Sequence, residues 1–547
     1  MFDEKCVLPL IGGSQSKPSA VQRRIADKAL ENIIEPFPNY ADIKFGPNFD
    51  WEHKEPGIET SFQLYLQNLR VVGTLLAEFS RSQNIAYLEK SEEIVLSWVE
   101  YVEAGNATEM TWYDHAVGAR SRVLMQFLAC MDEAGRDYDH ARFRALLERH
   151  ANLLMDDSLH RMNNHGLMMD MALISMGLGL ERMDYVYHGL GRAESIFWQT
   201  FSETGMHQEN SPEYHNMVSR MYRELEHFLM QNEMSFGSGV LRKLEFSSRH
   251  MNRLAKPDGK IPAIGDTGSQ RAVKSFNWDS FHDSMSGFSI LKSEECRAYL
   301  AFICGYSAKA HKHADDLSIL LNFQGEDFFV DSGKYNYGKN KFRSYVVSYK
   351  AHSSFTPNRA YARPEDNRYS RVIATDHYLD SSEFKVASGH NRGFKGARLR
   401  RSVYMVPGHS AIVINDLGQS SNNEAWVHRF VLSPKVEVSD VGPGRATLKV
   451  GEAEVTLEWL GAEMPNPSIE SGAIGKNSVK AVISQATNRV AKTKHLVFTS
   501  KRGKAVDASL VIHLGPGSST RVDDCGTYFA VSSQNSHGTV QLPKFQI

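Results

Sequence analysis

The hydrophobic pattern changes its period once along the 547 residues, and this change constrains the fold more than any other feature. Up to about Lys256, apolar residues recur three and four positions apart, as in Leu66, Leu69 and Val72, which is typical of amphipathic helices. Beyond that point, short alternating or β-branched runs such as RAYLAFICG and SAIVINDL end at Gly, Pro, Asn or Asp, which is typical of antiparallel strands. The chain is therefore predicted to be helical first and β second.

The first half is predicted to consist of helical hairpins joined by short loops, with stop signals such as Gly105 and Gly135. The expected helices cover residues 21–34, 61–80, 85–103, 115–133, 138–155, 165–179, 184–200, 212–232 and 238–254. Hairpins arranged in a ring form an α/α toroid, whereas hairpins stacked linearly form a solenoid. No fixed sequence period indicates a regular repeat array.

The second half is predicted to be an antiparallel β-sandwich, because turn residues separate many of its strands at intervals of about 8–12 residues. The segment PDGKIPAIGDTGSQ (257–270) is rich in Gly and Pro and is predicted to be a loop. The change of structure therefore falls between residues 257 and 286. We predict a helical domain over 1–270 and a β-sandwich over 271–547.

Composition narrows the class of partner. The 62 basic and 64 acidic residues leave a formal charge of -2, so no global field attracts nucleic acid. No apolar run approaches the roughly 20 residues that span a bilayer. The first residues lack the basic and long apolar regions of a signal peptide, which predicts a cytoplasmic protein, or a secreted or periplasmic one whose signal has been removed. The five cysteines show no CxxC spacing and indicate neither a disulfide framework nor a thiolate zinc site.

Two polar clusters lie in the helical half. In the first, WYDHAVGAR (112–120), Arg120 suits a bidentate grip on a carboxylate or sulfate, although a solvated helix face with Trp112 buried explains the same residues. In the second, Asn164 and His165 follow Asn163 at the start of an apolar run. One asparagine can cap that helix, but a cap does not explain all three side chains.

A third cluster, ENSPEYH (209–215), coincides with a predicted helix start, because Ser211 precedes Pro212. Tyr214 and His215 then lie in the first turn, where the helix dipole favours anions. We expect nearby arginines and this dipole to lower the pKa of Tyr214, so that it can act as a base and then as an acid. An aromatic packing residue beside an exposed histidine is an equally good interpretation.

A fourth cluster combines HKHADDLS (311–318) with Asp331 and with His352. In an extended strand His311, His313 and Asp315 would project to one side. Two histidines and a carboxylate, with a further histidine some distance on, are ligands that a divalent metal such as zinc accepts. A histidine satisfied by ordinary hydrogen bonds is the simpler alternative for each position alone.

Taken in order, these motifs resemble the heparinase II/III-like polysaccharide lyases, a group that includes alginate lyases. The matching text covers most of the chain and comprises WYDHAVGAR (112–120), NNHG (163–166), ENSPEYH (209–215), HKHADDLSILL (311–321), FFVDSGKYNY (328–337), AHSS (351–354) and, more weakly, GHNRG (389–393). The resemblance implies an N-terminal α/α toroid, an incomplete barrel of helical hairpins, followed by the β-sandwich. It also implies β-elimination at a uronic acid of a glycosaminoglycan (hyaluronan, chondroitin or heparan type) or an alginate-like chain, giving 4,5-unsaturated products.

The resemblance also assigns roles to residues. Asn164 would hydrogen-bond the uronate carboxylate beside His165, Tyr214 would be the acid and, depending on stereochemistry, also the base, and His311 would be the partner base or help to neutralise the carboxylate. Expected substrate contacts are Trp112, His115, Arg120, Asn210, His215 and His390. A structural zinc would correspond to His313, Asp331 and His352, with Asp315 or Asp316 as a substitute for Asp331. Neutralising the carboxylate lowers the barrier to removing the C5 proton, and no organic cofactor is needed.

Two other functions compete with the lyase. A toroid glycoside hydrolase acting on acidic oligosaccharides would use paired carboxylates recruited from Glu209, Glu213 and Asp114. A non-catalytic glycan-binding protein would keep the cleft without the chemistry, which the presence of Asn164 and Tyr214 disfavours. The expected partner in each case is an acidic polysaccharide or oligosaccharide, with no nucleic acid and no membrane, and the oligomeric state stays open.

Overall fold

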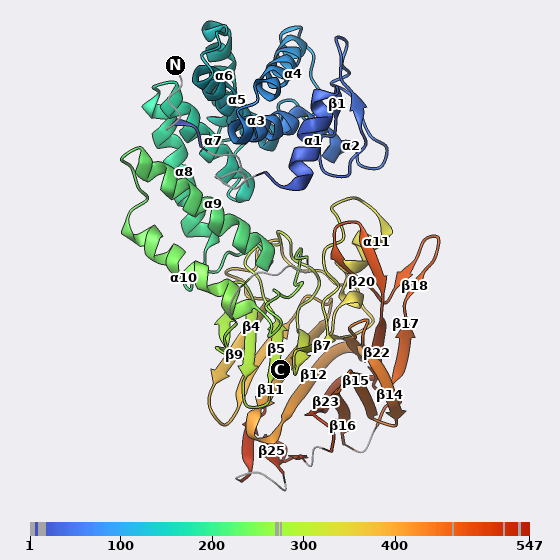
Figure 1. Cartoon of the computed structure of the whole chain (residues 1–547). Coiled ribbons are helices and arrows are strands. Elements are labelled where there is room, and N and C mark those ends of the chain that lie inside the picture. Colours follow the sequence, from blue (N-terminus) through green and yellow to red (C-terminus); the bar gives the residue numbers. More distant parts are fainter. Residues whose placement is uncertain are drawn as a thin grey trace. The chain divides into compact units, whose positions relative to one another are not determined.

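The computed structural model describes residues 6–8, 18–268, 273, 276–461, 464–517, 520–533 and 538–547 (Figure 1). The chain forms two compact units. The helical unit comprises Met1–Thr200 and Arg220–Arg242, and the β unit comprises Phe201–Ser219 and Lys243–Ile547. The sequence prediction divided the chain once, after residue 270, whereas the compact units interleave. The reason is that helices α9 (Pro212–Gln231) and α10 (Ser238–Leu254) each contribute one end to each unit.

The helices of the first part match the predicted segments closely. They are α1 (Ala20–Leu30), α2 (Glu59–Gln67), α3 (Arg70–Ser82), α4 (Ile85–Glu103), α5 (Asp114–Glu133), α6 (His140–Leu154), α7 (Asn164–Gly179) and α8 (Met183–Thr200), with the short strands β1 (Ile33–Ile34) and β2 (Ile43–Lys44). The predicted helix 61–80 is two helices, because Leu69 takes a left-handed φ of 55° that interrupts the hydrogen-bond ladder. Its side chain is fully buried, so the break anchors the chain in the core.

Helix α5 packs against both α3 and α7, and its contact with α7 brings two of the sequence motifs together. At Gly118 an added Cβ would lie 3.4 Å from the backbone oxygen of Met168, so the two helices are close at this point. His115 on α5 and His165 on α7 consequently face each other, with ring centroids 5.0 Å apart. The close approach of α5 and α7 therefore builds one polar cluster out of two separate motifs.

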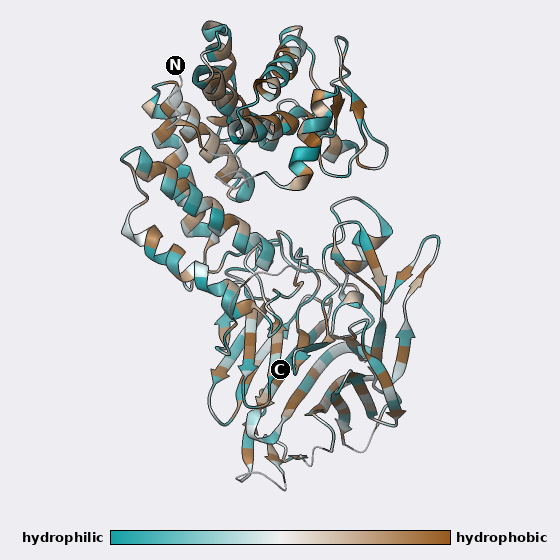
Figure 2. Cartoon of the chain, in the orientation of Figure 1, coloured by the Kyte–Doolittle hydropathy of each residue, from teal (hydrophilic) through white to brown (hydrophobic). Residues whose placement is uncertain are grey.

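The β unit consists of antiparallel sheets, as predicted. A five-stranded sheet runs in the order β3 (Phe281–Asp283), β4 (Phe288–Ser293), β5 (Ala298–Ile303), β6 (Ser318–Phe323), β7 (Glu326–Phe329). An eight-stranded sheet runs β14 (Glu437–Gly442), β15 (Arg445–Val450), β16 (Ala453–Leu460), β23 (Gly503–Leu514), β12 (Ala411–Glu424), β11 (Ala397–Val406), β10 (Lys385–Asn391), β9 (Ile373–Asp380). Figure 2 shows apolar and polar bands alternating along several of these strands, because successive side chains point to opposite faces of a sheet.

Smaller elements surround these sheets. A four-stranded sheet runs β17 (Ser468–Ser471), β22 (Lys494–Thr499), β13 (Val427–Val431), β8 (Phe355–Thr356), and a three-stranded one runs β24 (Arg521–Asp524), β25 (Tyr528–Ser532), β26 (Val540–Pro543). The remaining elements are the hairpins β18 (Ala473–Ile474)–β19 (Val479–Lys480) and β20 (Val482–Ala486)–β21 (Arg489–Lys492), helix α11 (Lys341–Val346) and the 3-10 turns Tyr349–Ala351 and Pro407–His409. No helix among the described residues combines the length and apolarity needed to cross a bilayer.

A buried ion cluster ties the loops of the β unit to its large sheet. Arg401 on β11 donates two hydrogen bonds, of 2.7 and 2.8 Å, to the carboxylate of Asp416 on β12, and His428 Nδ1 donates to the same carboxylate at 2.7 Å. The other end of the guanidinium donates at 2.9 Å to the backbone oxygens of Leu317 and Ser353. Leu317 lies in the HKHADDLS motif and Ser353 directly follows His352, so the cluster fixes the loops that carry these histidines.

Candidate active site

Tyr214 and His311 form a stacked pair in the β unit. Tyr214 lies in the first turn of α9 and His311 in the loop between β5 and β6, with ring centroids 3.6 Å apart and planes at 21°. A hydrogen bond of 2.9 Å joins the hydroxyl of Tyr214 to that of Tyr337. Both rings of the pair remain partly exposed. The prediction that the third and fourth motifs supply neighbouring side chains therefore agrees with this geometry.

Asp266 is the residue that organises this pair, and sequence reasoning missed it. Its carboxylate accepts hydrogen bonds from His311 Nδ1 (2.8 Å) and His313 Nε2 (2.9 Å), and from both terminal nitrogens of Arg343. It lies in the 257–270 segment, which we predicted only as a loop. Gly265 allows the close approach, because it takes a φ of 56° and a Cβ there would lie 2.4 Å from the backbone oxygen of Asn210.

The electrostatics of Asp266 follow from these contacts. Burial alone would raise the pKa of this carboxyl, but the hydrogen bonds from His311, His313 and Arg343 outweigh burial and hold it well below its usual range. His311 also approaches a second carboxylate, since its Nε2 lies 3.6 Å from Glu209 Oε2. The ionised carboxylate of Asp266 therefore faces Nδ1 of His311, and the carboxyl group of Glu209 lies near its Nε2.

The expected lowering of the Tyr214 pKa is wrong. Burial raises the pKa of the phenol, the hydrogen bond with Tyr337 partly opposes this, and the negative charges of Asp266, Glu209 and Glu213 add to the rise. The surrounding carboxylates were not apparent from the sequence, in which the arginines and the helix dipole seemed to dominate. A phenol with a raised pKa keeps its proton near neutral pH and is suited to be an acid.

The His-x-His-x-Asp motif does not lie in a strand, contrary to prediction. Residues 309–317 form a loop before β6, and His311 takes a left-handed φ of 57°. His311 and His313 still point to a common partner, Asp266. Asp315 is instead bound by Lys312 Nζ at 2.5 Å. The irregular backbone thus separates the motif's carboxylate from its imidazoles.

Three of the predicted metal ligands lie together in the β unit. Potential ligand atoms of His313, Asp331 and His352 all lie within 4.8 Å of one another, and all three residues are buried. His313 Nδ1 and His352 Nε2 have no hydrogen-bond partner among the residues that the structure describes. Because an unpaired buried polar atom costs about 1–3 kcal/mol, and two imidazoles with a carboxylate are a zinc-type donor set, these residues fit a divalent metal.

The alternative ligands Asp315 and Asp316 are committed elsewhere. Lys312 Nζ lies 3.0 Å from Asp316, whose other oxygen accepts a hydrogen bond from the Tyr361 hydroxyl at 2.8 Å. Asp331, by contrast, accepts a hydrogen bond from His352 Nδ1 at 3.0 Å. The geometry therefore groups Asp331, and neither alternative, with His313 and His352.

In the helical unit, Asn164 and His165 are the first two residues of α7, and Asn163 is its N-cap. The side chain of Asn163 accepts hydrogen bonds from the backbone amides of His165 (3.0 Å) and Gly166 (3.3 Å), which leaves the capping role to Asn163. His115 faces His165, and burial together with His165 lowers the pKa of His115 to about 4. At neutral pH His115 is therefore uncharged.

Arg120 does not fit the substrate contact that we predicted. Its guanidinium is fully buried and donates to the backbone oxygens of Gln67 and Thr111, both at 2.7 Å, and to His150 Nε2 at 2.9 Å. It braces helices within the core of the helical unit. Trp112 is partly buried, and the guanidinium of Arg149 lies 3.9 Å from the centroid of its ring.

The other expected substrate contacts have structural partners in the β unit. Asn210 Nδ2 donates to the backbone oxygens of Ala308 (2.6 Å) and Ala310 (2.9 Å), so it braces the loop leading to His311. His215 is fully buried and is held between the backbone of residues 207 and 247. His390 on β10 binds Asp376 at 3.1 Å and the backbone oxygen of Arg371 at 3.0 Å.

The carboxylates that a hydrolase would need are also engaged. Glu213 accepts hydrogen bonds from Lys334 Nζ (2.7 Å) and the amide of Gly268 (2.9 Å). Asp114, the first residue of α5, accepts a hydrogen bond from the backbone amide of His115 at 2.6 Å. Glu209 is buried beside His311. The geometry therefore favours a reaction that uses the imidazole of His311 and the phenol of Tyr214 over one that needs two free carboxyl groups.

Comparison with known proteins was made on sequence and on structure. The model of the heparinase II/III N-terminus matches residues 12–290, and that of the heparinase II/III-like C-terminal region matches residues 277–530. No curated protein matches the sequence. A crystal structure of heparinase III has a TM-score of 0.79 at 14% identity, covering 99% of this chain and 94% of that one.

Other solved structures share the same architecture. A heparan sulfate lyase mutant from Pedobacter heparinus has a TM-score of 0.72 at 14% identity, covering 98% of this chain and 92% of that one. Chondroitinase AC lyase has a TM-score of 0.58 at 10% identity, covering 95% of this chain and 86% of that one. At these identities the likeness shows the fold, and it confirms the predicted α/α toroid followed by an antiparallel β-sandwich.

Proposed function

The chain belongs to the heparinase II/III-like family of polysaccharide lyases, and from this premise we propose that it cleaves a uronic-acid-containing glycan by β-elimination. The observation that carries the proposal is the stacked pair of Tyr214 and His311, with Asp266 bound to the imidazole. A substrate of the glycosaminoglycan type, heparan sulfate first among them, is our preferred choice, and an alginate-like chain is the next.

In the proposed reaction His311 is the base. Its Nδ1–H donates to Asp266, which leaves the lone pair on Nε2 to take the proton from C5 of the uronate. The carboxylate of Asp266 stabilises the imidazolium that forms, and it fixes the ring orientation as the third group of a catalytic triad does. The electrons of the C5–H bond become the C4–C5 double bond.

Tyr214 is the acid of the same reaction. As the bond from C4 to the glycosidic oxygen breaks, that oxygen takes the electron pair and then the phenolic proton. The raised pKa of Tyr214 keeps this proton in place until the bond breaks. Tyr337 donates to or accepts from the same hydroxyl, and so orients it.

Charge neutralisation is the role that we propose for Asn164 and His165. Asn164 and His165 at the start of α7 would donate hydrogen bonds to the uronate carboxylate, because an ionised carboxylate resists the further negative charge that develops when C5 loses its proton. His115 lies beside His165 and, with its pKa lowered to about 4, is uncharged near neutral pH.

We further propose that His313, Asp331 and His352 hold one zinc ion. Bound there, zinc would supply a fixed positive charge and cross-link the loops at 313, 331 and 352. Because Asp266 also binds His313, such a cross-link would stiffen the support of His311. The proton transfers above are carried by Tyr214 and His311.

The test is a product assay on a panel of heparan sulfate, chondroitin, hyaluronan and alginate. We expect ultraviolet absorbance from the unsaturated product with at least one of them. Tyr214→Phe should lower kcat by about 10²-fold or more while binding is retained, since a general acid typically contributes 10²–10⁴-fold. Release of reducing sugar without a double bond would select the hydrolase, and a folded protein inactive on every polymer would count against the lyase.

A further inference from the structure

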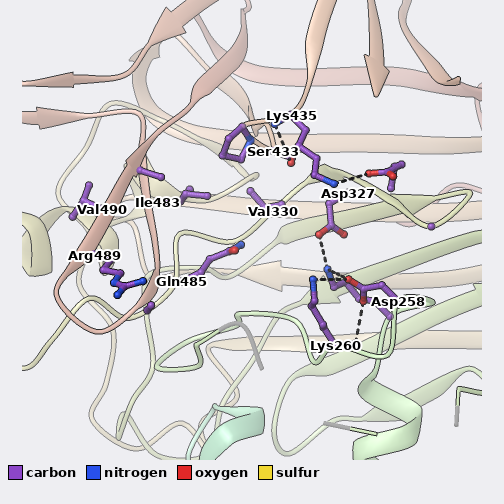
Figure 3. Close-up of a pocket in the computed structure, with 16 residues that line it drawn as sticks. Asp258, Lys260, Asp327, Val330, Ser433, Lys435, Ile483, Gln485, Arg489 and Val490 are labelled. Atoms are coloured by element: carbon purple, nitrogen blue, oxygen red, sulfur yellow. Dashed lines mark hydrogen bonds and ion pairs between the residues drawn. The ribbon is translucent and has the colours of Figure 1, made fainter. Parts of the chain in front are cut away.

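A cavity of about 550 Å³ opens in the β unit, and it is separate from the residues to which we assign the chemistry (Figure 3). Its walls come from residues 256–260 after α10, the β6–β7 turn, residues 433–435 after β13, and the hairpin β20–β21. The volume lies within the roughly 300–1,000 Å³ of small-molecule sites. All of its lining residues belong to one compact unit.

The cavity combines an apolar floor with a charged rim. Val330 and Ile483 form part of the lining and are 5% and 4% exposed. Three lysines of the rim are each paired with a carboxylate of the same rim: Lys256 with Asp327 (2.5 Å), Lys260 with Asp258 (3.5 Å) and Lys435 with Glu326 (3.3 Å). These pairs cancel in charge but offer both donors and acceptors at the mouth of the cavity.

One basic side chain of the rim, that of Arg489, is not paired with a carboxylate of any described residue. The guanidinium of Arg489 has neither a hydrogen bond nor an ion pair with any described side chain or backbone atom, and the side-chain amide of Gln485 has none either. Figure 3 shows both side chains on the hairpin side of the cavity. The rim therefore has a surplus of one positive charge, carried by a side chain suited to a bidentate grip on a planar or tetrahedral anion.

We propose that this cavity binds one acidic sugar residue of the glycan, with its carboxylate or sulfate on Arg489. The hydroxyl groups would exchange hydrogen bonds with Gln485 and the lysine–carboxylate pairs, and a C–H face of the ring would cover Val330 and Ile483. This inference rests on the proposed function and extends it, since it assigns the chain a second sugar site.

The hairpin connects this site to the candidate active site within the β unit. Ile483 and Gln485 line the cavity, while Ser484 between them donates its amide to the backbone oxygen of Ser332 at 2.7 Å. At the hairpin turn Asn488 Oδ1 accepts from Asn336 Nδ2 at 2.6 Å, next to Tyr337. One face of the hairpin thus bounds the cavity, and its edge braces the loop that carries Tyr337.

Binding of glucuronate, glucose 6-sulfate and glucose to the full chain, measured by saturation-transfer NMR, tests the proposal. Arg489→Ala should weaken binding of the acidic sugar about 10-fold, the scale of a lost charge-assisted hydrogen bond, and Gln485→Ala should weaken it less. Arg445→Ala, an exposed arginine on β15 outside the cavity, is the matched control and should change nothing. Whichever of glucuronate and glucose 6-sulfate binds more tightly shows whether the site prefers a carboxylate or a sulfate.

Two results would overturn the site: unchanged affinities in Arg489→Ala, or glucose binding as tightly as both acids. Kinetics separate its failure from that of the lyase. If the lyase is active, Arg489→Ala should raise KM for long chains and leave kcat unchanged. An unchanged KM would contradict the second sugar site but not the lyase activity. If no polymer is cleaved but binding of the acids still depends on Arg489, the second site stands and the lyase assignment fails.

Discussion

His115 in the helical unit and His311 in the β unit have opposite surroundings. In the helical unit His115 faces another imidazole, His165, and burial with that neighbour lowers its pKa to about 4. In the β unit His311 and His313 share the carboxylate of Asp266, and His428 is bound to Asp416. The same type of side chain is thereby kept neutral at His115 and supplied with a countercharge at His311, His313 and His428.

This difference indicates a division of labour. His115 stays uncharged near neutral pH, so it brings no charge of its own to the start of α7, where Asn164 and His165 lie. An imidazole held by a carboxylate becomes a stronger base or a well-oriented metal ligand. Substitutions at Asp266, Asp416 and His165 test how strongly each of these surroundings acts.

The largest expected effect concerns the core. Asp416→Asn leaves the buried Arg401 without its countercharge and should lower the free energy of unfolding by about 3–5 kcal/mol, the usual result of breaking a buried ion pair. Urea denaturation of both proteins measures it. Arg401 and His428 lower the pKa of Asp416 against the effect of burial, so its contribution is complete above pH 4 and is lost as the pH falls further. A loss below 1 kcal/mol would refute the structural importance of the cluster.

At the active site, Asp266→Asn should reduce kcat about 10- to 100-fold with little change in KM, because the residue positions His311 and does not touch the substrate. Steady-state kinetics on the cleaved glycan provide the measurement. Glu213→Gln is the matched control. Because this carboxylate binds Lys334, its replacement should reduce kcat less than Asp266→Asn does. A larger loss in the control than in Asp266→Asn would favour the hydrolase instead.

Metal binding should depend on His313, Asp331 and His352. We expect about one divalent metal per chain by mass spectrometry of the metal content, lost in His352→Ala and kept in His390→Ala. Removal of the metal by a chelator should lower the thermal midpoint of the native protein, because binding stabilises only the folded state. Metal-free wild type with an unchanged midpoint would contradict the zinc proposal.

The pH dependence of kcat should have a late alkaline limit. An acid must be protonated to act, and the pKa of Tyr214 is raised, so activity should persist above pH 10 where an ordinary tyrosine begins to ionise. Tyr337→Phe removes a hydrogen bond that lowers this pKa and should move the limit further upward. A limit that moves downward in this variant would show that another group titrates.

The smallest effect is expected in the helical unit. NMR titration should find the imidazole of His115 half-protonated near pH 4, and His165→Ala should raise that pKa while leaving it below 6.5, because burial is the larger cause. An unchanged pKa would show that the two rings do not interact electrostatically.

Sequence reasoning predicted the helices, the strands and the order of the motifs because these depend on local spacing. The period of three to four residues in α3 and α5, and the alternating runs of β11 and β16, are visible without knowing any partner. The same holds for the cap of α7, where Asn163 binds amides two and three residues away.

Contacts between distant residues could only be decided by the tertiary structure. Asp266 meets His311 and His313 across 45 and 47 residues of sequence, and the hydrogen bonds of Arg120 reach as far as Gln67. The pKa of Tyr214 rises because folding buries it near carboxylates that lie as far along the chain as Asp266. Burial and charge depend on all neighbours in space, whereas a motif records only neighbours along the chain.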